Sequence, residues 1–339
     1  MKYNQINRLI LFGGAPLLAA TAKMAQGMNL ALFVYTSPRH IEEVLDDQGN
    51  TLKDELDKLK IKYCITENIN QEKDELFQQV DANTLGIGMG EAWSFDEEII
   101  KKFSGRLLDF MGIPHPRYRG GAHYTWMILR GDKIGGCNLQ VINTEMIQGE
   151  FDSGEIVKSV NYNFPESARI PLDYFNAAVP QEINFIKEFL QEVEAGKEFN
   201  LHFPQESQSL FLPRLNTIEQ GWINWAWLGV DIERFICAFD EPYAGASTLV
   251  NGCRVHLKTA YLDDREKAFH SFQSGLVVRI TPEEGIVIAS SSGLLKIKRV
   301  LNEIHQDITM QLKLGDRFYT PYHQLEESLL FRANYNAKK

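Results

Sequence analysis

Long hydrophobic runs are missing from this sequence of 339 residues. No apolar stretch approaches the roughly 20 residues that a membrane-spanning helix needs. The first residues lead into a short strand-like run and not into the pattern of a signal peptide. These absences predict a cytoplasmic protein with no membrane partner. Internal repeats and low-complexity segments are missing as well, so we expect ordinary globular domains.

Cysteine is also scarce, and basic residues are outnumbered by acidic ones. The four cysteines lie far apart, with no C-x-x-C pair and no histidine at metal-ligand spacing, so we expect reduced, mostly buried thiols and neither a disulfide framework nor a bound metal. The net charge of -10 disfavours a nonspecific grip on nucleic acid, which depends on Lys and Arg that neutralise phosphates. The remaining composition, with 44% hydrophobic and 24% charged residues, is that of a soluble protein long enough for two domains.

Short apolar runs alternate with helical patterns through the first half of the chain. The runs predict strands over 8–12, 30–35, 84–89 and 107–110, and the helical patterns predict helices over 16–27, 52–59 and 96–103. A longer helix over 174–195 closes this domain, which we place at 1–200. Alternating strands and helices indicate an α/β fold with an open, mainly parallel, Rossmann-like sheet, whose ligands bind beyond the carboxyl ends of the strands.

The second half has a different pattern. Polar residues with two prolines over 201–220 predict a linker. Short runs separated by glycine follow, and they predict strands over 254–260, 274–281, 285–289 and 294–300. We therefore expect a small β domain over 221–325, shaped as a partly open, OB-like barrel, and a tail over 326–339.

One stretch in the middle of the chain carries most of the functional information. It reads Asp109-x-Met111-x4-Pro116-x-Tyr118-Arg119-Gly120, followed by Trp126 and later by Phe151-Asp152-Ser153-Gly154-Glu155-Ile156. The stretch resembles the signature of the folate-dependent formyltransferases, which runs Asn-x-His-x4-Pro-x-Tyr-Arg-Gly, a Trp, and then Asp-Thr-Gly-Asp-Ile. The Pro, Tyr, Arg, Gly and Trp fall at the family's spacing without a gap, whereas Asp109 and Met111 replace the family's Asn and His.

The second half of the chain carries the same resemblance. Three segments are similar to the start of the family's carboxy-terminal domain: Gly221-Trp222-Ile223-Asn224-Trp225, Ile232-x-x-Phe235-Ile236-x-Ala238-Phe239 and Pro242-Tyr243-Ala244-Gly245-Ala246. Matching segments thus occur in both expected domains. The resemblance implies that the protein is a formyltransferase with 10-formyltetrahydrofolate as its cofactor and an amine as its acceptor.

The altered motif raises a question about catalysis. Acyl transfer needs a donor aimed at the developing oxyanion and a proton-handling group beside the reacting atoms. In the family the Asn and the His fill these roles and an aspartate orients the His, and the resemblance assigns this last role to Asp152. Asp109, when ionised, only accepts hydrogen bonds, and Met111 offers no proton chemistry. The sequence is therefore compatible with an enzyme of rearranged chemistry or with a scaffold that has lost catalysis.

His115 is a further catalytic candidate, because it precedes Pro116 and the family's catalytic His is also commonly followed by Pro. A deletion in the loop would bring His115 onto the catalytic position, but the family's Asn position would then fall on Ile113. The ungapped alignment keeps residues 107–108 in the strand and preserves all later spacings. In that alignment His115 lies near enough to act as a relocated base, and a loop histidine that faces solvent is the alternative.

Glycines mark a candidate cofactor cleft. Gly88 and Gly90 lie where backbone lines the family's folate cleft, and glycine permits the close approach of a pterin ring. Trp93 follows them. Gly13 ends the first strand, where the amino end of a helix can receive folate or a phosphate. Ordinary turn structure is the alternative for each of these glycines.

Two acceptors dominate the two-domain formyltransferases: the methionine amine of initiator tRNA and the amine of a nucleotide-linked amino sugar. The tRNA enzymes carry a basic loop after the second strand, whereas residues 41–50 here are acidic and would repel phosphates. The sequence therefore favours the amino sugar, with Tyr118 and Arg119 as candidate substrate residues or as scaffold. Other amine-like acceptors, and a binding or regulatory partner without catalysis, are alternatives. The sequence leaves open whether the protein forms a homodimer.

Overall fold

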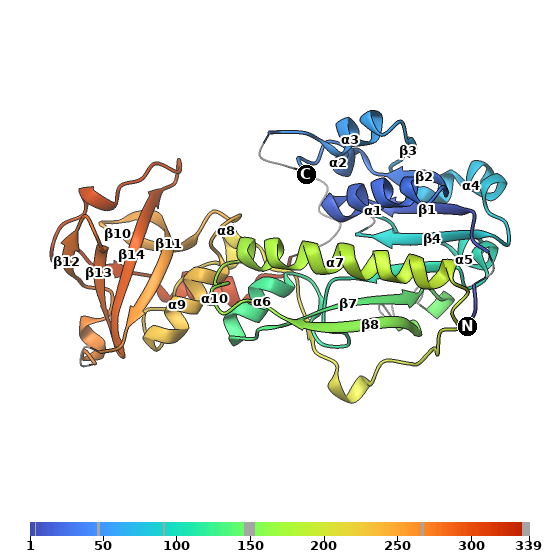
Figure 1. Ribbon diagram of the computed structural model, residues 1–339. Coiled ribbons are helices and arrows are strands. Elements are labelled where there is room, and N and C mark those ends of the chain that lie inside the picture. The colour runs from blue at the N-terminus through green and yellow to red at the C-terminus, as the bar shows by residue number, and fades with distance from the viewer. Residues whose placement is uncertain (4, 46–47, 91, 146–152, 266–267, 334–339) are drawn as a thin grey trace. The chain divides into compact units, whose positions relative to one another are not determined.

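The computed structural model describes residues 1–3, 5–45, 48–90, 92–145, 153–265 and 268–333 (Figure 1). The chain forms two compact units. The first contains Met1–Arg119, Ile134–Asn163 and Ala178–Leu210, and the second contains Gly120–Lys133, Phe164–Ala177 and Phe211–Lys339. Two segments from the first 200 residues thus pack with the second unit.

The described part of the first unit contains a sheet of seven strands in the order β3-β2-β1-β4-β5-β7-β8. Neighbouring strands from β3 to β5 are parallel, and β7 and β8 add two antiparallel strands at one edge. This confirms the predicted open, mainly parallel sheet. The strand bounds are β1 (Arg8–Gly13), β2 (Ala31–Thr36), β3 (Lys62–Ile65), β4 (Thr84–Met89), β5 (Leu107–Met111), β7 (Ile134–Val141) and β8 (Ile156–Asn163).

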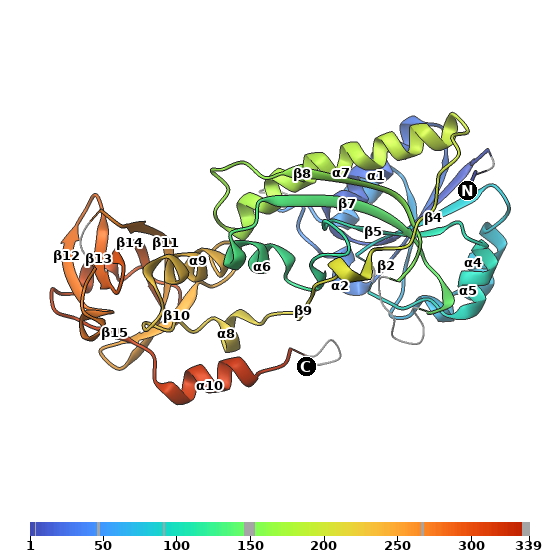
Figure 2. The same ribbon diagram turned by 90° about the horizontal axis from the view of Figure 1, so that it is seen from below.

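Helices cover both faces of this sheet (Figures 1 and 2). Side chains alternate along a strand, so Leu9 and Leu11 of β1 enter one buried cluster while Ile10 and Phe12 enter the other. The first cluster is completed by α1 (Ala15–Gly27), α3 (Leu52–Lys58) and the part of α7 (Pro171–Glu194) that belongs to this unit. The second is completed by α4 (Lys73–Gln79) and α5 (Glu97–Phe103). A short helix α2 (Pro38–Ile41) follows β2.

Local capping explains where the predicted helices begin. Thr51 accepts from the backbone N–H of Asp54 and the Asp54 carboxylate accepts from that of Thr51, which forms a capping box ahead of α3. Asp96 accepts a hydrogen bond of 3.2 Å from the N–H of Ile99 at the start of α5. These signals are local, and the helices lie where the sequence predicts them.

The second unit is built on an antiparallel sheet with the order β12-β13-β14-β11-β10-β15 among the described residues. The sheet curls until its outer strands meet, since a bridge joins Leu276 to Arg317 and the N–H of Val277 donates to the carbonyl of Asp316 at 2.8 Å. The predicted small β domain is confirmed. Its strands are β10 (Ala246–Val250), β11 (Cys253–Asp263), β12 (Val277–Thr281), β13 (Gly285–Ser290), β14 (Gly293–Asn302) and β15 (Phe318–Tyr319).

Short elements accompany this curled sheet. The helix α9 packs against β11 and β14, and α6 packs against α9. The bounds are β6 (Arg119–Gly120), α6 (His123–Arg130), β9 (Phe211–Leu212), α8 (Thr217–Gln220), α9 (Gly229–Ala238) and α10 (Tyr322–Leu330).

No helix in the described ranges is long and apolar enough to cross a membrane, and no group of three or more potential metal ligands occurs within them. The four thiols are free. Cys137 and Cys237 are buried, Cys64 is partly buried and Cys253 is exposed.

Candidate active site

Four polar or sulfur-bearing side chains share one face of the sheet where β5 ends. Asp109 and Met111 alternate with Leu108 and Phe110, which belong to the buried cluster on the opposite face. Across the antiparallel pair, Asp109 lies opposite Gln140 and Met111 opposite Asn138. Met111 is the last residue of β5, whereas the sequence predicts it as the start of the loop, because pairing with Asn138 extends the strand by one residue.

Gln140 links the two residues that replace the family's Asn and His. Its amide Nε2 donates to Oδ2 of Asp109 at 3.3 Å and to Sδ of Met111 at 3.6 Å. The side chain is fully buried, and its Oε1 accepts no hydrogen bond from the described residues. An unsatisfied buried carbonyl oxygen costs roughly 1–3 kcal/mol, which favours a functional reason for an amide here.

The turn after β5 is fixed from the side of β7. The amide of Asn138 donates to the carbonyl oxygen of Ile113, which also accepts from the N–H of His115 at 2.9 Å. Gly136 lies against this turn, and a Cβ atom added there would approach Pro114 Cα to 2.6 Å. The turn that leads from Met111 to His115 is therefore held by contacts that only small or amide side chains on β7 allow.

Arg119 forms hydrogen bonds with side chains of the same unit. Its guanidinium donates to both carboxylate oxygens of Glu206 at 2.7 and 2.9 Å, and to Oγ of Ser209 at 3.1 Å. Its Nε donates to Nε2 of His115 at 3.1 Å. The hydrogen bonds from Arg119 hold the pKa of Glu206 below its ordinary value. An accepting Nε2 places the proton of a neutral His115 on Nδ1, so Arg119 orients this imidazole.

Tyr118 is only 2% exposed and has a φ of 63°, in the left-handed region that non-glycine residues rarely adopt. Such a backbone persists where the surroundings hold it in place, and Tyr118 lies between the engaged residues His115 and Arg119. Tyr118 and Arg119 remain candidate substrate residues. The burial of Tyr118 and the hydrogen bonds of Arg119 also stabilise the loop.

The candidate cofactor residues lie along the carboxyl ends of neighbouring strands. Gly88 lies opposite Asp109 in the pairing of β4 with β5, and Gly13 lies opposite Met89 in the pairing of β1 with β4. Gly90 has a φ of 68°, and a Cβ atom added there would meet nothing within 4 Å. Trp93 packs against the buried cluster beneath, and its Nε1 is buried without a partner in the described part of the chain.

The structure thus brings together Asp109, Met111 and Gly88, with His115 at the end of the adjoining turn. Asp152 lies outside the described residues. Gln140 and Glu206 were missed by the sequence reasoning. A signal for Gln140 exists, because apolar residues Cys137, Leu139 and Val141 alternate with polar ones as in a strand. Nothing local marks Glu206, which lies in the predicted linker.

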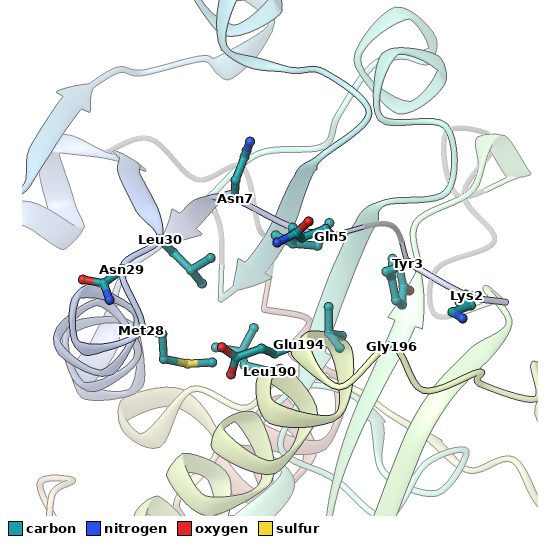
Figure 3. Close-up of a pocket in the computed structure, with 12 residues that line it drawn as sticks. Lys2, Tyr3, Gln5, Asn7, Met28, Asn29, Leu30, Leu190, Glu194 and Gly196 are labelled. Atoms are coloured by element: carbon teal, nitrogen blue, oxygen red, sulfur yellow. The ribbon is translucent and has the colours of Figure 1, made fainter.

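A separate cavity of about 590 Å³ occurs at the opposite end of the first unit (Figure 3). It is lined by residues that precede β1, by Met28 to Leu30 just ahead of β2, and by the last turn of α7, including Leu190 and Glu194. Because it lies at the amino ends of the parallel strands, it is no part of the candidate active site.

Comparison with known proteins finds formyltransferases. The model of the formyl transferase C-terminal domain matches residues 216–312. A methionyl-tRNA formyltransferase of Acetivibrio thermocellus is 24% identical over 197 residues, which are 58% of this chain and 59% of the relative. These matches support a member of the formyltransferase family. The motif-based resemblance is thereby confirmed. A second such relative, from Roseiflexus castenholzii, is 26% identical over 55% of each chain, so the matched region spans little more than half of these relatives.

Several solved structures share the fold. WlaRD, a sugar 3N-formyl transferase, matches with a TM-score of 0.64 at 15% identity, over 88% of this chain and 99% of its own. An N-formyltransferase from Helicobacter canadensis matches with a TM-score of 0.65 at 14% identity, over 86% of this chain and 98% of its own. HypX from Aquifex aeolicus matches with a TM-score of 0.56 at 17% identity, over 97% of this chain and 48% of its own.

Proposed function

We propose that this protein transfers a formyl group from 10-formyltetrahydrofolate to the amine of a nucleotide-linked amino sugar. The observation that carries the proposal is the half-buried Asp109, held by the Gln140 amide at the carboxyl end of β5 in a formyltransferase fold. Three structural neighbours support the ligand classes. The structure of WlaRD was solved with dTDP and 5-N-formyl-THF, that of the Helicobacter canadensis protein with folinic acid and dTDP-3-aminofucose, and that of HypX with tetrahydrofolic acid.

The residues at the strand ends fit a flat, hydrogen-bonding ring such as the folate pterin. Trp93 offers an aromatic side chain and a buried indole N–H that the described residues leave unpartnered. Gly88 and Gly90 bring no side chain, and the space beyond Gly90 is open. These three residues would hold the folate. When bound, 10-formyltetrahydrofolate supplies an activated formyl group, whose carbon forms the new bond to the acceptor nitrogen while its bond to the folate nitrogen breaks.

Asp109 handles the proton in this proposal. The Gln140 amide donates to Oδ2 of Asp109, and in this proposal the Asp109 carboxylate accepts the proton that the attacking amine loses and passes it to the departing folate nitrogen. Met111 has no proton to give or take. Nε2 of His115 accepts from Arg119, which places the proton of the neutral imidazole on Nδ1. The family role of Asp152, which is to assist proton removal, is part of the proposal.

The names of the sequence relatives raise a second acceptor, methionyl-tRNA. Charge favours the sugar over the tRNA, because residues 41–50 contain four acidic residues and no basic one, and the chain carries a net charge of -10. A nucleic acid backbone is gripped by Lys and Arg. We therefore keep the amino sugar as the acceptor and treat the tRNA as an outcome of the test.

The test supplies purified protein with 10-formyltetrahydrofolate and either dTDP-3-aminofucose or methionyl-tRNA, and mass spectrometry detects the formylated product. We expect formylation of the sugar nucleotide. The rate should be at least about 100-fold lower for Asp109→Asn. The control variant Glu194→Gln, which changes an exposed residue of α7, should have the wild-type rate. Efficient transfer to methionyl-tRNA alone would overturn the choice of acceptor. Folate binding without transfer to any amine would favour a binding or regulatory protein.

A further inference from the structure

A carboxyl group interrupts the apolar face of α7. The buried side chains of this helix recur at helical spacing, and Glu182 occupies one of their positions with only 9% exposure. The apolar members of this face are Ala178, Phe185, Ile186, Phe189, Leu190 and Val193. Acidic side chains are almost never buried at such positions unless they are paired. The burial of the Glu182 carboxyl therefore needs an explanation.

The Glu182 carboxyl lies against the turn that follows β5. A Cβ atom added at Gly112 would lie 2.5 Å from Oε1 of Glu182, so the carboxyl occupies the space that any larger residue would fill. Gly112 directly follows Met111, and the next residue, Ile113, has its carbonyl bound by Asn138 from β7. The turn is thus held between an amide from β7 and a carboxyl from α7.

No group neutralises this carboxyl within the described ranges. Glu182 forms no hydrogen bond or ion pair with the residues that the structure describes. Lys158 of β8 lies over the ring of Phe185 on α7, but its ammonium pairs with Glu188 and Glu192 at 3.5 and 3.0 Å. Cys137 from β7 and Tyr162 from β8 are within electrostatic reach of Glu182.

Burial controls which of these groups titrates. Desolvation raises the pKa of Glu182 to about 7. It also raises the pKa values of the Cys137 thiol and the Tyr162 phenol, mainly by burial and to a lesser degree through Glu182, so both stay neutral at physiological pH. Of these three groups, Glu182 is the one whose pKa lies near neutral pH.

We propose that Glu182 is a positioning residue, whose neutral carboxyl supports the turn from Met111 to His115 and whose ionisation loosens that turn. A neutral carboxyl packs against a backbone Cα and an aromatic ring, and Phe110 supplies the ring beside Gly112. A carboxylate needs water or a donor. Because Gly112 has no side chain to seal the gap, solvation of the carboxylate displaces the turn, and with it the loop end of the candidate active site.

Only the expected effect on formyl transfer rests on the proposed function. The main test therefore measures the turn itself and not the enzymatic activity. Hydrogen exchange of a peptide that covers residues 107–118 is measured between pH 6 and 8 and corrected for intrinsic exchange. In the wild-type protein the ionised fraction of a group with a pKa near 7 rises from about one tenth to about nine tenths over this range. We expect protection to fall several-fold in the wild type, to stay constant in Glu182→Gln, and to follow the wild type in the matched helix variant Glu194→Gln.

An unchanged pH dependence in Glu182→Gln, or its loss in Glu194→Gln, would overturn the inference. If Glu182→Gln fails to fold, the test uses the wild-type protein labelled with carbon-13 in its glutamate carboxyl groups. NMR then follows the titration of Glu182 directly. The Glu182 resonance must then titrate together with the Gly112 amide, and independent titration of the two would overturn the inference as well.

The rate of formyl transfer gives the second readout. In the wild type this rate should fall above pH 7. In Glu182→Gln this fall with pH should be absent. If neither protein transfers a formyl group while the exchange result holds, the positioning role stands and the proposed function fails.

Discussion

Replacing Glu182 by Gln should change how the stability of the first unit depends on pH. Burial raises the pKa of this carboxyl from 4.5 to about 7 in the folded protein. A group whose pKa is raised by folding stabilises the protein below its unfolded pKa, and this stabilisation is lost as the pH rises through the folded pKa. The wild-type protein should therefore lose stability from pH 4.5 to about 7 through this group, whereas glutamine has no proton to lose.

The size of the effect follows from the same numbers. Each unit of pKa difference corresponds to about 1.4 kcal/mol, so the stability difference between Glu182→Gln and the wild type should grow by roughly 2.5 kcal/mol between pH 5 and pH 8, in favour of the variant at high pH. Other groups titrate alike in both proteins and cancel in the difference.

Urea denaturation of both proteins at pH 5, 6, 7 and 8 measures this difference. The transition of the first unit is followed separately, because a chain with two units need not unfold in one step. The exposed variant Glu194→Gln serves as the control, and its difference from the wild type should stay flat. A difference for Glu182→Gln that changes by less than about 0.5 kcal/mol over this range would refute the reasoning, since it would mean that folding leaves the carboxyl solvated.

Further predictions concern the residues around the candidate site. Gln140→Leu keeps the volume but removes the amide that donates to Asp109, and we expect formyl transfer to fall by about 100-fold with little loss of thermal stability, because an unpaired buried oxygen also disappears. Gly112→Ala forces the Glu182 carboxyl aside, and we expect a loss of roughly 1–3 kcal/mol in chemical denaturation that is smaller in a Glu182→Ala background. Additive effects in that double-mutant cycle would contradict the contact. Arg119→Lys cannot bind both oxygens of Glu206 while donating to His115, and we expect about 2 kcal/mol of destabilisation in thermal melts. Wild-type melting of Arg119→Lys would show that the bidentate pair contributes nothing.

Local signals in the sequence determined the main elements of the first unit. Apolar runs and caps predict β1, β4 and β5 and the helices α1, α3 and α5, because a strand's alternation and a helix's first hydrogen bonds involve neighbouring residues. The motif from Asp109 to Gly120 carried the resemblance to the formyltransferases and predicted a candidate site at a strand end. The strands β7 and β8 were not predicted, and neither was the packing of 120–133 and 164–177 with the second unit.

Only the tertiary structure decided what surrounds the altered catalytic positions. Gln140 reaches Asp109 across 31 residues of sequence, and Glu206 reaches Arg119 across 87. Glu182 reads as a surface residue until the packing of α7 places it beneath Gly112. Sequence spacing fixes which side chains a strand or helix presents on one face, but strand register and helix packing fix which distant side chain meets them, and those depend on contacts between segments far apart in the chain.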